Sequence, residues 1–188
     1  MNRTAVVLFA GDARREEAQK GLPARFLATL HDRLTRAIRA FDVDLLIADD
    51  LVDDCALGEK IERTFATTFA RCYERVIVLA GDIVLPPAIL ERAIESNETL
   101  IGRTHDGGFY ILASNAQPSI DWGSLTFDHV AAQLDEYATL PELRDVDSID
   151  DARVVAPSLI ASRIVPHRQS AIPSAHALRD TQLRAPPS

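Results

Sequence analysis

Residues 75–82 read RVIVLAGD, an apolar run that ends in a glycine and an acid. Such a run is typical of a strand that is buried on both faces, as in the parallel sheets of α/β proteins. Residues 4–10 (TAVVLFA) and 43–48 (VDLLIA) show similar runs nearer the start of the chain. The sequence therefore predicts a buried sheet, with ligand-binding groups just beyond the carboxyl ends of its strands.

Segments with helical spacing separate these strands. Apolar residues recur three or four positions apart between Pro23 and Phe41, and again from Ile61 to Cys72. Residues 85–96 (LPPAILERAIES) predict a further helix, because prolines fit a first helical turn. This alternation predicts an α/β fold, a three-layer α/β/α sandwich around a mostly parallel sheet.

Two predicted strands have no helix between them. Residues 99–104 (TLIGRT) and 108–113 (GFYILA) are so close in sequence that one strand should run antiparallel, which makes the sheet mixed. The joining segment contains Asp106 followed by Gly107, a pair that favours a hairpin turn. Glycines also let a backbone approach a ligand closely, so the residues alone leave both a turn and a binding site open.

The remaining elements are less regular. Residues 127–137 show helical spacing, and Ser148 is a suitable N-cap for a last helix. Residues 11–25 and 49–54 are polar and charged, and we expect them to be loops.

The composition fits one domain, which we place at residues 1–160, with an extended or flexible tail at 161–188 that is rich in Pro, Ser and Ala. The net charge of −8 argues against nucleic-acid binding, which usually needs a basic face. The apolar start is too short to span a membrane. Because Cys55 and Cys72 lack disulfide or zinc spacing, we expect free thiols and a cytoplasmic location.

Carboxylates near the predicted strand ends are candidate metal ligands. Asp82 ends the strand at 75–82, and Asp145 and Asp147 should point to the same side of an extended segment. Mg²⁺ and Mn²⁺ prefer such hard oxygen ligands, so the three residues predict a site for either ion. For Asp82 alone, a helix cap or turn is the simpler explanation.

Basic residues gather after the first strand, at Arg14, Arg15, Lys20 and Arg25. They could bind phosphates, although a solvated charged segment, partly neutralised by Glu16 and Glu17, is the simpler alternative. Of the five histidines, only His105 stands beside a candidate acid.

Four stretches together resemble a known family: RVIVLAGDIVLPPAILERA, DGGFYILA, IDWGSLTF and LRDVDSIDDA. Their order and spacing resemble the bacterial radical SAM/selenodomain-associated transferases, a glycosyltransferase-like family. Those proteins are similar to GT-A nucleotide-diphospho-sugar transferases and, more distantly, to the molybdenum cofactor guanylyltransferase. The resemblance extends over about residues 4–156.

The resemblance implies a GT-A-like fold and metal-dependent transfer from a nucleoside-diphosphate sugar or an NTP to an unknown acceptor. It implies that Asp82 is associated with the metal and that the first-loop cations contact the nucleotide phosphates. It also implies that Asp106, Gly107, Gly108 and Trp122 lie on the acceptor or sugar side. If the acceptor is a hydroxyl, Asp106 is the candidate base.

Two segments depart from the family pattern. Ile83 and Val84 follow Asp82 where the family has a proline, and the first loop lacks the family's Lys-Thr-Arg-Leu. The alternative is therefore a catalytically silent relative that binds a nucleotide or a protein partner. A weaker third hypothesis is an aspartyl phosphotransferase centred on Asp82, for which Val84 replaces the expected second acid.

Overall fold

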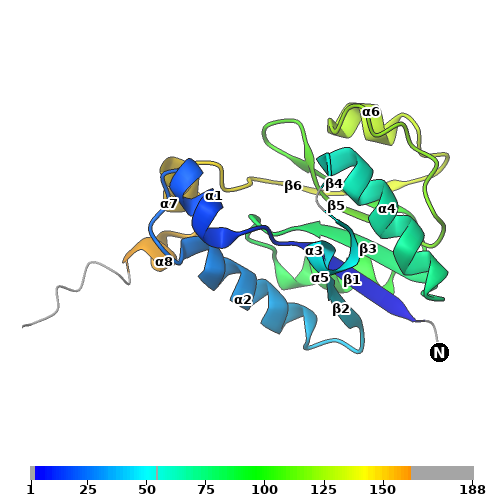
Figure 1. Cartoon of the computed structure of the whole chain (residues 1–188), viewed down its shortest axis with the longest axis horizontal. Helices are drawn as coiled ribbons and strands as arrows, with labels where there is room; N and C mark the ends of the chain where they lie inside the picture. Colours follow the sequence, from blue (N-terminus) through cyan, green and yellow to red (C-terminus); the bar gives the residue numbers. More distant parts are fainter. Residues whose placement is uncertain (1–2, 54, 162–188) are drawn as a thin grey trace, which may run out of the picture.

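A single six-stranded sheet lies between two helical layers in the computed structural model, which describes residues 3–53 and 55–161 (Figure 1). The strands are β1 (Thr4–Phe9), β2 (Asp44–Ile47), β3 (Arg75–Ala80), β4 (Leu100–Thr104), β5 (Phe109–Ser114) and β6 (Ala138–Leu143). They are ordered β2-β1-β3-β5-β4-β6, and only β5 runs antiparallel to its neighbours. The predicted mixed, mostly parallel α/β sandwich is confirmed.

Strands β1 and β3 form the centre of the sheet because most of their side chains are apolar and buried. Ala5 and Val7 face one hydrophobic cluster, while Val6 and Leu8 face the other. This alternation follows from the two-residue repeat of a strand. An apolar strand of this kind is stable only with helices on both sides, which explains the three layers.

The helices are α1 (Ala13–Gln19), α2 (Phe26–Ile38), α3 (Ala48–Leu51), α4 (Leu57–Ala70), α5 (Pro87–Glu95), α6 (Phe127–Ala131), α7 (Ile149–Val155) and α8 (Pro157–Ala161). Apolar residues of α2, α5, α7 and α8 join one core cluster, and those of α4 and α6 join the other (Figure 1). Across the described residues, no helix combines the length and apolar character that a membrane span requires.

Helix α1 lies in the segment that the sequence predicted as a loop, residues 11–25, and that prediction was wrong. Asp12 caps the helix by accepting hydrogen bonds from the backbone N–H groups of Arg14 and Arg15, at 3.0 and 3.2 Å. The helix has no apolar stripe, because the side chain that it buries is that of Glu17. Its signal is therefore absent from the hydrophobic pattern.

Glu17 connects α1 to α2. Its carboxylate accepts hydrogen bonds from the backbone N–H groups of Arg25 at 2.7 Å and of Leu27 at 2.8 Å. Helix α2 has no cap from its own N-cap residue, Arg25, which adopts a left-handed conformation with φ 66°. The buried acid thus accepts hydrogen bonds from helix N–H groups that would otherwise lack partners. Its negative charge also interacts favourably with the positive end of the helix dipole.

Two further predictions need correction. The predicted loop at 49–54 begins inside α3, where Val52 closes the turn by donating to the carbonyl of Ala48 at 3.1 Å. The helix predicted at 127–137 ends at Ala131, and the chain continues into β6, a strand that the sequence did not predict. Strand β6 lies at the sheet edge and buries only Leu140, so it lacks a strong apolar pattern.

Other local predictions agree with the structure. Strands β4 and β5 form the predicted antiparallel pair, and the Ser148 side chain caps α7 by accepting from the N–H of Asp151. Helix α8 follows α7, so the helix at Ser148 is not the last one. Cys55 and Cys72 are free thiols. The predicted tail lies outside the described residues from residue 162 onward.

Candidate functional site

A pocket of about 290 Å³ opens where β1, β3 and β4 end and β5 begins. Its apolar wall consists of Phe9, Leu57, Ile61, Val78, Ala80, Phe109, Tyr110 and Leu125. Its polar wall consists of Asp82, Thr104, Asp106, Gly108 and Asp145. Hollows of about 320, 380 and 480 Å³ lie elsewhere on the described residues, but this smaller pocket is the one that the ends of β1, β3 and β4 surround. Its place at the carboxyl ends of parallel strands is the usual ligand position in α/β folds.

The segment after β6 is fixed against the end of β3. Ile83 and Asp145 form an isolated antiparallel bridge, and the N–H of Val146 donates to the carbonyl of Asp82 at 3.0 Å. These backbone contacts bring two acids that are distant in sequence, Asp82 and Asp145, to one pocket wall. The sequence predicted that Asp82, Asp145 and Asp147 gather here, and the backbone does place the two segments that carry them together.

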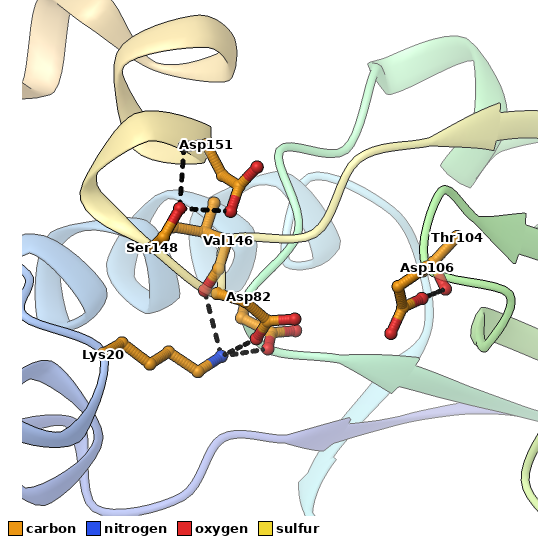
Figure 2. Close-up of polar contacts among 8 residues, drawn as sticks. Lys20, Asp82, Thr104, Asp106, Val146, Ser148 and Asp151 are labelled. Atoms are coloured by element: carbon orange, nitrogen blue, oxygen red, sulfur yellow. Dashed lines mark hydrogen bonds and ion pairs between the residues drawn. The ribbon is translucent and has the colours of Figure 1, made fainter.

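Lys20 reaches this junction from the end of α1 (Figure 2). Its ammonium donates to Asp82 Oδ2 at 2.7 Å and to the carbonyl of Val146 at 3.0 Å, and it lies 2.8 Å from Asp147 Oδ1. Burial opposes its positive charge, but the hydrogen bonds to Asp147 and Asp82 outweigh burial and raise the pKa of Lys20. Lys20 is therefore a charged internal partner of two acids.

Three carboxylates form a second group beside this ion pair. Asp106, Asp145 and Asp147 each offer one oxygen, and these oxygens lie within 4.8 Å of one another. Burial, then repulsion from Asp106 and Asp147, raises the pKa of Asp145 to about 6. The group thus carries more negative charge than its neighbours neutralise. This is the arrangement in which a cation is favoured.

The β4–β5 turn positions Asp106. The Thr104 hydroxyl donates to Asp106 Oδ1, and so does the N–H of Gly108 at 3.1 Å. These bonds, the Thr104 contact first, lower the pKa of Asp106. Gly107 has φ 92°, a backbone conformation that the missing Cβ permits. The turn and the pocket wall are therefore the same structure, and Asp106 lies there as an ionised carboxylate.

Of the four predicted phosphate-binding cations, Lys20 is the one that reaches the acids. Arg14 and Arg15 are exposed on α1, and Arg14 and Arg25 line a different hollow, which also contains Glu17 and Asp32. Arg14 and Arg15 lie on α1, Lys20 is its C-cap and Arg25 is the N-cap of α2, so the four cations do not converge on one position.

Trp122 is not one of the residues that line the pocket. Its ring stacks on Phe65, with the centroids 6.4 Å apart, and its backbone lies against Gly58. Any Cβ at Gly58 would lie 2.4 Å from the Trp122 carbonyl oxygen, so the glycine permits this approach. Trp122 therefore holds its loop against α4, while Gly108 lines the pocket directly.

Sequence reasoning missed His31 and considered His105 instead. His105 pairs with Glu142 at 3.6 Å, outside the residues that line the pocket. His31 lies beside Gly81, where a Cβ would be 2.9 Å from its Nε2 atom, and burial lowers its pKa while Asp82 partly offsets that effect. A signal was present, because His31 interrupts the apolar face of α2 four residues after Leu27.

Glu16 is a second residue that the sequence analysis did not place in the site. Its carboxylate lies over Gly11, where a Cβ would approach Oε1 to 2.1 Å. Burial raises its pKa, and Lys20 lowers it while Asp82 raises it further. Glu16 thus adds to the negative charge around Lys20. The described part of the site is acidic, with one lysine at its centre.

The chain belongs to the family described as "Uncharacterized protein conserved in bacteria (DUF2064)", whose model matches residues 6–131. No curated protein matches it in sequence. Among solved structures, it is similar to a proposed nucleotide-diphospho-sugar transferase from Desulfovibrio desulfuricans G20, with a TM-score of 0.68 and 18% identity over 91% of this chain and 92% of that one.

A lower likeness is to the inositol-1-phosphate CTP transferase from T. maritima, with a TM-score of 0.43 and 12% identity over 85% of this chain and 95% of that one. The likeness to the D. desulfuricans protein shows a shared fold. The GT-A-like, nucleotide-diphospho-sugar transferase-like fold that the sequence resemblance implied is therefore confirmed.

Proposed function

We propose that this chain is a transferase that binds a nucleoside-diphosphate sugar or an NTP in the pocket at the ends of β1, β3 and β4. The observation that carries the proposal is the group of three carboxylates, Asp106, Asp145 and Asp147, whose oxygens converge at a pocket with one apolar wall. A pocket with one apolar wall and a few convergent polar groups is typical of a small-molecule site. The fold, shared with a proposed nucleotide-diphospho-sugar transferase, supports this class of ligand.

The carboxylates fit a Mg²⁺ or Mn²⁺ ion by their chemistry. Carboxylate oxygens are the ligands that both ions prefer, and burial, followed by the charges of Asp106 and Asp147, raises the pKa of Asp145. Asp106, Asp145 and Asp147 would hold the ion, and of these three Asp147 also pairs with Lys20, as Asp82 does. A bound ion would supply Lewis-acid stabilisation of the negative charge on a phosphate leaving group.

The protein's own groups have separate tasks in this proposal. Phe9, Leu57 and Leu125 would contact the less polar face of the ligand and exclude water from it. Asp106, kept ionised by Thr104 and Gly108, would accept the proton of an acceptor hydroxyl. A carboxylate with a lowered pKa is a weak base, so its contribution depends on how closely the hydroxyl is positioned.

Nucleotide binding can be tested by thermal unfolding with NTPs and nucleoside-diphosphate sugars, each with and without Mn²⁺. At a ligand concentration of 100 Kd, binding stabilises the folded state by about 2.7 kcal/mol, which corresponds to roughly 5–10 °C in a chain of this length. Asp106→Asn should reduce the Mn²⁺-dependent part of that shift, because it removes one ligand oxygen, and should lower turnover, measured as release of nucleotide product. Asp128→Asn, an exposed acid paired with Arg103, is the matched control.

No stabilisation by any of these ligands, with or without Mn²⁺, would refute the proposal. A shift without turnover would instead favour the second candidate, a catalytically silent nucleotide-binding relative. One observation favours that candidate: Lys20 is engaged by two acids, and Arg14 and Arg25 line another hollow. The closer relationship to radical SAM/selenodomain-associated transferases and the cytoplasmic location stay predictions.

A further inference from the structure

Three oxygens surround the ammonium of Lys20: Asp82 Oδ2 at 2.7 Å, Asp147 Oδ1 at 2.8 Å and the carbonyl of Val146 at 3.0 Å. An ammonium has three N–H donors, so the three contacts use all of them. We propose that Lys20 is a tethered cation that occupies a divalent-cation position between Asp82 and Asp147. An external ion is then confined to the side formed by Asp106, Asp145 and Asp147, away from Asp82.

The oxygens around Lys20 are the first support for this proposal. Two carboxylates and a backbone carbonyl that point at one position are the kind of ligands that Mg²⁺ and Ca²⁺ bind in proteins. Here the position is filled by a cation that belongs to the chain itself (Figure 2). The distances suit an ammonium, since Mg²⁺ would require contacts of about 2.1 Å.

The choice of lysine is the second support. Only two of the chain's 20 lysine and arginine residues are lysines, Lys20 and Lys60. A lysine ammonium is a compact point charge with three rotatable donors, whereas the planar arginine fork matches two parallel acceptors. A site with three oxygens around one centre therefore suits lysine, in the same way that it suits a metal ion.

Burial is the third support. The side chains of Lys20 and Asp82 are 20% and 25% exposed, so water cannot fully replace either partner. Without a cation, Asp82 and Asp147 would face each other as carboxylates that only solvent neutralises. Helix α1 ends at Lys20, whose N–H donates to the carbonyl of Glu16 at 2.9 Å, and this contact fixes where the lysine side chain starts.

The proposal has a consequence that does not depend on transferase activity. If the ammonium belongs to the acid pair, a divalent ion should bind the unaltered chain without displacing Lys20. The N–H donors of Lys20 are then not free to bind phosphate. The proposal therefore concerns cation binding alone, and it can succeed or fail whether or not the chain binds a nucleotide.

The first experiment observes the lysine ammonium groups of the whole chain by ¹⁵N NMR. Two side-chain signals are expected, and Lys60→Met assigns them by removing one. The Lys20 signal should persist, with its hydrogen-bonded shift, as Mg²⁺ is added to saturation. If Mg²⁺ moves the Lys20 signal to the position of a solvent-exposed lysine, the ion displaces the ammonium and the proposal is overturned.

The second experiment measures Mn²⁺ binding by the EPR signal of the free ion. Lys20→Met should bind one additional Mn²⁺ or bind Mn²⁺ at least about tenfold more tightly, because a competing charge near two carboxylates is gone. Lys60→Met, which breaks an ion pair with Asp49 elsewhere, should match the unaltered chain. The double variant Lys20→Met with Asp82→Asn should lose the gain.

Folding of the variant is part of the same test. If Lys20→Met is unfolded alone but folds when Mn²⁺ is added, the ion has replaced the ammonium and the proposal is supported. If it neither folds with Mn²⁺ nor binds more of it, the position is not a divalent-cation position. Equal Mn²⁺ binding by folded Lys20→Met and Lys60→Met also overturns the proposal.

Discussion

Replacing Asp145 by asparagine should stabilise the protein at neutral pH. The pKa of Asp145 is raised from 3.8 to about 6, first by burial and then by the charges of Asp106 and Asp147. The folded state therefore holds a proton that the unfolded state has released between these two values. Stability from this residue is fully present below about pH 4 and is lost as the pH rises through about 6.

The magnitude follows from the difference between the two pKa values. About two pKa units correspond to roughly 3 kcal/mol, and contact with solvent reduces this to about 1–2 kcal/mol. Asparagine has nearly the same shape and cannot ionise. Asp145→Asn should therefore raise the free energy of unfolding by about 1–2 kcal/mol at pH 7.5 and by much less at pH 4.5.

Urea unfolding at both pH values, without divalent ions, measures the effect. Asp128→Asn is the control, because that acid is exposed and pairs with Arg103. A gain of the same size at both pH values, or no gain at pH 7.5, would refute the reasoning that unneutralised charge surrounds Asp145. Adding Mn²⁺ should stabilise the unaltered chain more than the variant, since the variant lacks one carboxylate.

Three further substitutions test the fold. Glu17→Ala should lower the free energy of unfolding, measured with urea, by about 2–4 kcal/mol, because the N–H groups at the start of α2 lose a charged acceptor. Glu17→Gln should lower it by less, and equal losses in the two variants would contradict this role. Gly102→Ala places a Cβ 2.3 Å from the Tyr110 ring and should cost about 1–3 kcal/mol, visible as a lower Tm; an unchanged Tm would show that the ring moves freely. Ser148→Ala should cost about 1 kcal/mol through the lost cap of α7, and a larger loss would mean that its bond to Asp151 has another role.

The central strands were predictable from their apolar composition. Strands β1 and β3 are apolar at nearly every position, and any arrangement that buries both faces requires that pattern. Strand β6 was not predictable for the opposite reason. Its burial is limited to Leu140, and Pro141 uses its carbonyl to accept from the Tyr110 hydroxyl, a partner that exists only after the sheet has formed.

Helix α1 shows a second limit of the hydrophobic pattern. Its buried side chain is a carboxylate, and burial of Glu17 is favourable only because the first N–H groups of α2 are directed toward it. Those donors lie 8 to 11 residues further along the chain. A pattern of apolar residues cannot report a helix whose packing depends on a hydrogen-bonded acid.

The candidate site was also predictable only in part. That acids should gather beyond the strands was predictable, because the strand ends determine where they lie. Which acid forms an ion pair with which partner was not predictable, because the backbone bridge between Ile83 and Asp145 determines that arrangement. Lys20 neutralises Asp82 and Asp147 together, while Asp106 and Asp145 keep their charge at the pocket wall. The affinity of this pocket for a cation therefore depends on a lysine whose role is visible only in three dimensions, and changing that one residue should alter metal binding more than changing any other basic residue that the structure describes.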